Sequence, residues 1–191
     1  MHRNDLLVKL TGYRPFDTRE SESLRRIIEF VGANPRCFLR SLSIGHITGS
    51  AWLIDGQGDR VLLTHHRKLG MWLQLGGHAD GNADVLQVAL REAKEESGLS
   101  EIRPVNEDIF DLDVHDIPMR DGEPAHTHFD IRFLLQAEGV GKCRISDESV
   151  DLRWFTPEEL NDLCVDESLR RMARKWRRWL ESSASRRLRT S

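Results

Sequence analysis

Long hydrophobic runs are missing from this 191-residue sequence. No apolar stretch approaches the roughly 18 residues that a membrane-spanning helix needs. The start of the chain, residues 1–9, places Asp5 and Lys9 around only three consecutive apolar residues, so it lacks the hydrophobic region of a secretory signal peptide. These absences exclude a helical membrane protein and predict a cytoplasmic one.

Cysteine is scarce: the chain has three, Cys37, Cys143 and Cys164. An odd number at wide spacing fits neither a disulfide framework nor a cysteine zinc cluster. We therefore expect plain reduced thiols.

Basic charge is also scarce over most of the chain. Residues 1–169 hold 19 Lys and Arg against 30 Asp and Glu, a balance of −11, whereas residues 170–191 hold nine basic residues and one acidic residue. An extended nucleic-acid groove requires a basic stripe, which this acidic body does not offer. The same acidity leaves room for sites that hold divalent cations.

The pattern of apolar residues predicts helices at both ends and strands between them. Residues 1–45 read as a helical extension, and residues 166–180 as an amphipathic helix. In between, a helix that Asn82 or Asp80 caps and Gly98 ends follows a polar loop over 78–82. The predicted strands are residues 47–54, 61–65, 71–75, 109–115, 127–136 and 150–154. Strands grouped around one well-marked helix predict an α/β or α+β sandwich.

The most informative segment is residues 77–99, GHADGNADVLQVALREAKEESGL. On a helix Glu92, Glu95 and Glu96 stand at i, i+3 and i+4, so their carboxylates project from one face. A hard cation such as Mg²⁺ would relieve the repulsion among them, and Arg91 can orient one of the carboxylates. The alternative is an ordinary solvated acidic helix face with Arg91 and Lys94 as counter-charges.

This segment resembles the Nudix box, a pattern of Gly, Glu, Arg-Glu, Glu-Glu and Gly at fixed spacing. The matching positions are Gly77, Arg91, Glu92, Ala93, Glu95, Glu96, Gly98 and Leu99. One position departs from the pattern, because Ala83 stands where the family has its first Glu. Asp84 or Asp80 could replace that carboxylate in part.

The resemblance implies a Nudix-type α/β/α sandwich with a mixed sheet. It divides the chain into an N-terminal helical extension (1–45), a Nudix domain (46–165) and a C-terminal amphipathic helix with a basic tail (166–191). It implies Mg²⁺- or Mn²⁺-dependent cleavage of a diphosphate bond in a nucleoside diphosphate linked to another group. The implied metal ligands are Glu92, Glu95 and Glu96, and Glu148 in a later loop is a further ligand. Glu96 and Glu148 are both left open as the general base, and a simple acidic turn is the alternative for Glu148.

A second group of polar residues follows the predicted strand 127–136. Alternation places His126, His128, Asp130 and Arg132 on one face and apolar residues on the other. Because the resemblance extends to a bacterial Nudix subgroup with a GGHAD string and an HxHxD strand, we expect Gly77, His78, His126, His128 and Asp130 to contact substrate. The alternative is an exposed strand face with incidental histidines.

Two other function classes remain open. A Nudix-fold module that binds a nucleotide without turnover is one, since Ala83 breaks the box. An isopentenyl diphosphate isomerase is the other. That enzyme has a cysteine near the box, and this sequence has none there. The basic face of the last helix is either solvated or paired with the acidic body, so we do not expect a nucleic-acid partner. Such a helix also allows a homodimer.

Overall fold

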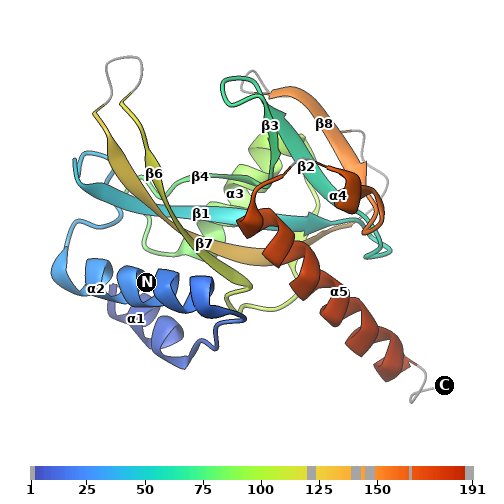
Figure 1. Ribbon diagram of the computed structural model, residues 1–191, viewed down its shortest axis with the longest axis horizontal. Helices are drawn as coiled ribbons and strands as arrows, with labels where there is room; N and C mark the ends of the chain where they lie inside the picture. Colours follow the sequence, from blue (N-terminus) through green and yellow to red (C-terminus); the bar gives the residue numbers. More distant parts are fainter. Residues whose placement is uncertain (1–2, 120–123, 139–142, 145–148, 164, 188–191) are drawn as a thin grey trace.

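The computed structural model describes residues 3–119, 124–138, 143–144, 149–163 and 165–187. These residues form five helices and eight strands (Figure 1). The helices are α1 (Arg3–Gly12), α2 (Thr18–Ala33), α3 (Val85–Ser97), α4 (Glu159–Asp162) and α5 (Glu167–Arg187). The strands are β1 (Gly45–Ile54), β2 (Val61–His66), β3 (Met71–Leu73), β4 (Leu75–His78), β5 (Ile102–Pro104), β6 (Asp111–Ile117), β7 (His126–Ala137) and β8 (Ser149–Phe155).

The strands form one mixed sheet around the parallel pair β1 and β7. The order along the sheet is β3-β2-β1-β7-β5, while β4 pairs with β1, β6 with β7 and β8 with β2. The β1–β7 register runs from Gly45 opposite Thr127 to Ile54 opposite Gln136, and the other pairs are antiparallel. The predicted mixed α+β sandwich with helices at both ends of the chain is confirmed.

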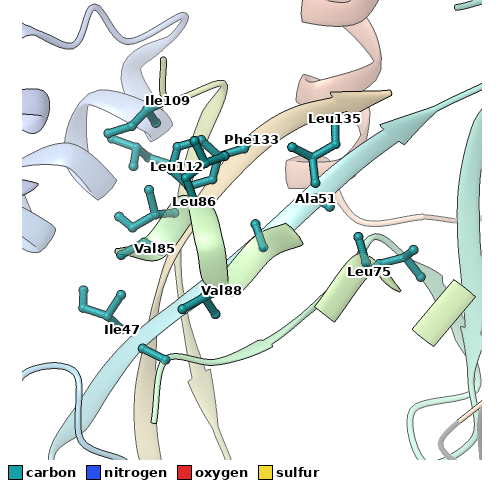
Figure 2. Packing of buried hydrophobic residues seen from close by; sticks show 14 of the residues in the cluster. Ile47, Ala51, Leu75, Val85, Leu86, Val88, Ile109, Leu112, Phe133 and Leu135 are labelled. Atoms are coloured by element: carbon teal, nitrogen blue, oxygen red, sulfur yellow. The ribbon is translucent and has the colours of Figure 1, made fainter. Parts of the chain in front are cut away.

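Alternation along β1 directs side chains to two separate cores. Ile47, Ala51 and Leu53 belong to the larger core, which α3 covers from behind the sheet in the view of Figure 1. Figure 2 shows Val85, Leu86 and Val88 of α3 packed in that core. Trp52 and Ile54 point the other way into a second core.

Helix α5 closes the second core. Its buried face carries Leu169, Met172, Ala173 and Trp176, the residues that its helical period predicts. The Trp176 and Trp52 rings meet edge to face at 6.0 Å. This docking leaves the first half of the same sheet face, toward the start of β1 and β7, for polar residues.

The N-terminal helices pack on the larger core. Asp17 caps α2 by accepting a hydrogen bond from the Glu20 N–H at 2.9 Å. Ile27 and Val31 are fully buried, and Phe30 stacks on Phe129 of β7 with ring centroids 3.8 Å apart. Helix α2 therefore supports β7 from the side opposite the polar residues of that strand.

Local details differ from the sequence prediction around the box. The predicted strand 71–75 is two strands, because the chain leaves β2 after Leu73 and joins β1 at Leu75. The helix cap assigned to Asn82 or Asp80 is wrong: Asp84 is the N-cap, and its side chain accepts from Gln87 N–H at 3.4 Å. Gly98 does end the helix, in the left-handed region at φ 71°. The short strand β5 and the last turns of α5 were not predicted.

No helix among the described residues combines the length and the apolar content needed to cross a membrane.

Candidate active site

A cavity of about 620 Å³ opens on the polar part of the sheet face. Its walls come from β1, β2, β4, β6 and β7, from the loop that follows β2, and from α3. A volume of this size is in the range of small-molecule sites. The cavity brings together two residue groups that are far apart in sequence, the box carboxylates and the histidines of β7.

Two of the three box carboxylates line this cavity, Glu92 and Glu96. Glu96 Oε2 accepts a hydrogen bond from the Gly76 N–H at 2.8 Å, which ties α3 to β4. Glu95 is exposed on the same helix. Carboxylate oxygens are the donors that Mg²⁺ and Mn²⁺ prefer, and Mg²⁺ needs only one or two of them beside water and phosphate oxygens. The donor set therefore fits the cation that the resemblance implies.

Arg91 contacts Glu92 rather than the cavity. Its Nη2 donates to Glu92 Oε1 at 2.5 Å and to the His78 carbonyl oxygen at 2.8 Å. Burial raises the pKa of the Glu92 carboxyl, and although Arg91 opposes that shift, the negative charges of Glu95 and Asp80 add to it. Arg91 therefore holds Glu92 in place and does not itself face the cavity.

Gly77 leaves the space that the Glu92 carboxylate occupies. A Cβ at this position would lie 2.6 Å from Glu92 Cδ and Oε2. We expect Gly77→Ala to displace this flexible carboxylate and to lower turnover by about 10- to 100-fold, the cost of a shift near 1 Å at a reacting centre. Measured by urea unfolding, the free energy of unfolding should change by less than about 1 kcal/mol.

Gly76→Ala is the matched control. A Cβ at Gly76 would lie 2.7 Å from the Ser50 Cα, a backbone atom that cannot rotate away. This variant should lose stability, by about 1–3 kcal/mol as in other overpacked sites. If Gly77→Ala instead unfolds like Gly76→Ala and keeps its turnover per folded molecule, the assigned role of Gly77 is wrong.

The position of the missing box carboxylate is apolar. Ala83 packs against the larger core. Of the two acids proposed to replace it, Asp84 is used as the helix cap, whereas Asp80 lines the cavity. Asp80 is therefore the better placed substitute.

Asp130 and Arg132 are buried, so the interpretation of this part of the β7 face as an exposed strand surface is wrong. Asp130 is 1% exposed and accepts hydrogen bonds from Thr48 Oγ1 at 2.9 Å and Ser50 Oγ at 2.8 Å. Arg132 Nε donates to Asp130 Oδ2 at 2.7 Å. The carboxylate lines the cavity and also cross-links β1 to β7.

The predicted substrate contacts of the histidine group come together here. His78, His126 and His128 all line the cavity, and His115 from β6 joins them. The His126 and His128 Nε2 atoms lie 3.1 Å apart. Burial lowers the pKa of His128, and the positive charges that neighbouring histidines would carry lower it further. His128 is therefore neutral at physiological pH.

Three basic side chains that the sequence analysis did not select also line the cavity: Arg40, Arg67 and Lys68. Arg67 Nη2 donates to the Ser149 carbonyl oxygen at 2.8 Å, which places it at the start of β8. Arg67 and Lys68 could have been found from the sequence, because they directly follow His65 and His66 at the end of β2. Positive side chains and carboxylates in one cavity are the combination that a phosphate group and a bound cation need together.

The remaining predicted residue, Glu148, lies outside the described residues. On α5, Arg171 and Lys175 point to the body of the protein and pair with Asp111, as the paired alternative for this basic face expects. Arg170 on the same helix is exposed.

Comparisons with known proteins agree with this geometry. The model of the NUDIX domain matches residues 46–180. A NUDIX-family hydrolase from Clostridium perfringens is 26% identical, with 69% of this chain and 95% of that chain covered and a TM-score of 0.53. A C. elegans Ap4A hydrolase shares the fold at 18% identity and a TM-score of 0.58, over 71% of this chain and 98% of the other. The MutT protein from Methanosarcina mazei does so at 19% identity and a TM-score of 0.56, over 72% and 96%.

A search of curated proteins finds no match. The domain match nevertheless spans more than half of the chain, and it contains the box helix and every residue that lines the cavity except Arg40. The chain therefore belongs to the NUDIX domain family.

Proposed function

We propose that this Nudix pyrophosphohydrolase cleaves the diphosphate bond of a nucleoside diphosphate linked to another group, with Mg²⁺ or Mn²⁺ held by Glu92, Glu95 and Glu96. The observation that carries the proposal is the shared cavity. Carboxylates from α3 and the basic side chains of Arg40, Arg67 and Lys68 all line it. A phosphate-rich ligand satisfies both, since it pairs with the basic groups directly and with the carboxylates through a cation.

Different residues of the chain have different roles in the proposed reaction. A divalent cation held by Glu92, Glu95 and Glu96 would neutralise the diphosphate and would lower the pKa of the attacking water. Arg91 orients Glu92, and the Gly76 N–H orients Glu96. Glu96 and Glu148 remain the two proposals for the general base. Gly77, His78, His126, His128 and Asp130 form the wall that would contact the rest of the substrate.

The deciding experiment is a product-resolved screen of nucleoside triphosphates, dinucleotides and nucleotide sugars. Each is incubated with Mg²⁺, with Mn²⁺ and with excess chelator. The proposal expects one class to release a monophosphate-containing product with either metal and none with chelator. Intact substrates in every class would overturn it.

A binding module without turnover is the second candidate, and the apolar environment of Ala83 favours it. It expects a nucleotide to raise the melting temperature with no product formed. Ala83→Glu would then be the first variant to test for a gain of turnover.

The remaining parts of the proposal concern the whole chain. We propose that residues 46–165 form the catalytic domain, that the protein acts in the cytoplasm, and that α5 allows a homodimer. Membership of the bacterial Nudix subgroup with the GGHAD string and the HxHxD strand also stays a proposal.

A further inference from the structure

Among the residues that the structure describes, one buried histidine has no hydrogen-bond partner on either ring nitrogen. His46 on β1 is 2% exposed, and within the described part of the chain neither its Nδ1 nor its Nε2 finds a partner. A buried polar group without a partner costs about 1–3 kcal/mol. Such a cost indicates that a ligand completes the site.

The sheet register directs other histidines at His46. His128 of β7 stands directly opposite His46 on the parallel strand β1. His78 of β4 stands opposite Thr48, two residues further along β1 and on the same face. The His46 ring centroid is 4.9 Å from that of His78 and 4.9 Å from that of His128. Three neighbouring strands therefore hold three imidazoles around one point.

The donor atoms of these rings converge closely. One nitrogen from each of His46, His78 and His128 lies within 4.8 Å of the other two. Among the described residues this is the one group of three potential ligands that converges so closely. Tetrahedral ligands at about 2.0–2.1 Å from a zinc ion lie about 3.4 Å from one another. Ring rotations that move each nitrogen by about 1 Å would therefore close the site.

The chemistry of the group differs from that of the box. Neutral imidazole suits Zn²⁺ and other late first-row ions, whereas Mg²⁺ requires oxygen donors. Burial and, to a smaller extent, the charges of neighbouring His78 and His126 together lower the pKa of His46 to about 4. The rings of His46 and His128 are thus already in the neutral form that binds metal.

We propose that His46, His78 and His128 form a binding site for one divalent transition-metal ion of the zinc class, distinct from the carboxylate site. His78 and His128 line the cavity, so the fourth coordination position opens into it. Three protein ligands with one open position are the arrangement of zinc sites that bind a substrate or water. His126, which also lines the cavity and whose Nε2 lies 3.1 Å from that of His128, is a further nitrogen donor beside the group. Metal binding by these histidines does not require that the carboxylate site catalyses a reaction.

The test is a titration of the metal-free protein with Co²⁺ and with Zn²⁺, without nucleotide and with Mg²⁺ in excess. Co²⁺ bound to nitrogen ligands in four-coordinate geometry absorbs visible light far more strongly than Co²⁺ in a six-coordinate oxygen site. We expect one ion per chain, the strong absorption, and displacement by Zn²⁺. His78→Gln and His128→Gln should each weaken binding by at least 10- to 100-fold, the range already found when outer contacts of a metal site are removed.

Two matched variants separate this site from the others. His65→Gln changes a histidine on β2 whose ring packs on Trp72, outside the group, and should bind Co²⁺ like wild type. Glu96→Gln should also keep the binding even if it destroys turnover. Weak absorption, or binding lost in Glu96→Gln and kept in His128→Gln, would overturn the proposal.

A readout on the unmodified protein covers the case in which a variant fails to fold. The ring nitrogens of His46, His78 and His128 should shift together in ¹⁵N NMR spectra when one equivalent of Zn²⁺ is added. Unchanged signals from these three rings would also overturn the proposal.

Discussion

Glu96→Gln is expected to lower metal-dependent turnover by about 10²- to 10⁴-fold while the fold stays intact. The Gln carbonyl oxygen can still accept the hydrogen bond that Gly76 N–H donates to Glu96 at 2.8 Å. The substitution therefore removes the charge and keeps the contact between α3 and β4. Loss of one positioned acid–base group costs about 10²–10⁴ in rate, and a metal clamp contributes several kcal/mol, at 1.36 kcal/mol for each tenfold change.

The melting temperature gives an independent readout for this variant. Three carboxylates share one face of α3, so removing one charge lessens their repulsion in the metal-free protein. The metal-free variant should be at least as stable as wild type, and Mg²⁺ should stabilise it less. Glu101→Gln, at an exposed acid just beyond α3, is the control and should behave like wild type in both assays. Wild-type turnover of Glu96→Gln would contradict the role of the box in this chain.

The box helix could be predicted because its determinants are local. The apolar period, the Gly98 terminator and the spacing of Glu92 and Glu96 all lie within one helix, and the structure reproduces them. The cap was misassigned because Asn82 and Asp84 are both good caps, and Asn82 instead accepts from the Asp84 N–H at 2.9 Å. Only the loop conformation decides between two such neighbours.

The β7 face shows what a strand period leaves open. Alternation correctly places His128, Asp130 and Arg132 on one side of the strand. Whether that side is exposed depends on β1, which supplies hydroxyls to Asp130, and on α5, which covers the strand further along. The hydroxyl contacts join residues 82 and 80 positions apart, and α5 is also distant from β7 in the sequence, so a local pattern does not contain these contacts.

The buried charges between the sheet and α5 are the second place where distant contacts decide the structure. Asp111 at the start of β6 is fully buried. Arg171 of α5 donates to both its carboxylate oxygens, at 2.8 and 2.9 Å, and to the Leu112 carbonyl oxygen at 2.8 Å. Arg132 and Lys175 also contact Asp111, at 3.1 and 2.9 Å. The sequence left the basic face of α5 either solvated or paired with the acidic body, and at Arg171 the pairing anchors the helix.

We expect Arg171→Met to lower the free energy of unfolding by about 3–5 kcal/mol, the cost of breaking a buried ion pair from one side. Methionine fills much of the space that Arg171 occupies. The buried carboxylate of Asp111 then lacks the two hydrogen bonds that Arg171 donates to it. Arg170→Met changes the exposed neighbour on the same helix and should shift the value by less than about 0.5 kcal/mol. Urea unfolding monitored by tryptophan fluorescence measures both. Equal effects of the two variants would mean that the buried pair does not anchor α5.

The pH dependence of this difference tests its electrostatic origin. Burial acts to raise the pKa of Asp111, but the hydrogen bond from Arg171 and the charges of Arg132 and Lys175 outweigh burial and hold the pKa below its ordinary value. The same holds for Asp113, where Arg132 is the main opposing charge. A depressed folded-state pKa adds stability above the unfolded value of about 3.9, and this stability is lost as the pH falls below it. Since Arg171→Met lessens the depression, its stability deficit should be largest at neutral pH and should shrink below about pH 4. A deficit that stays constant down to pH 3 would assign the effect to packing alone.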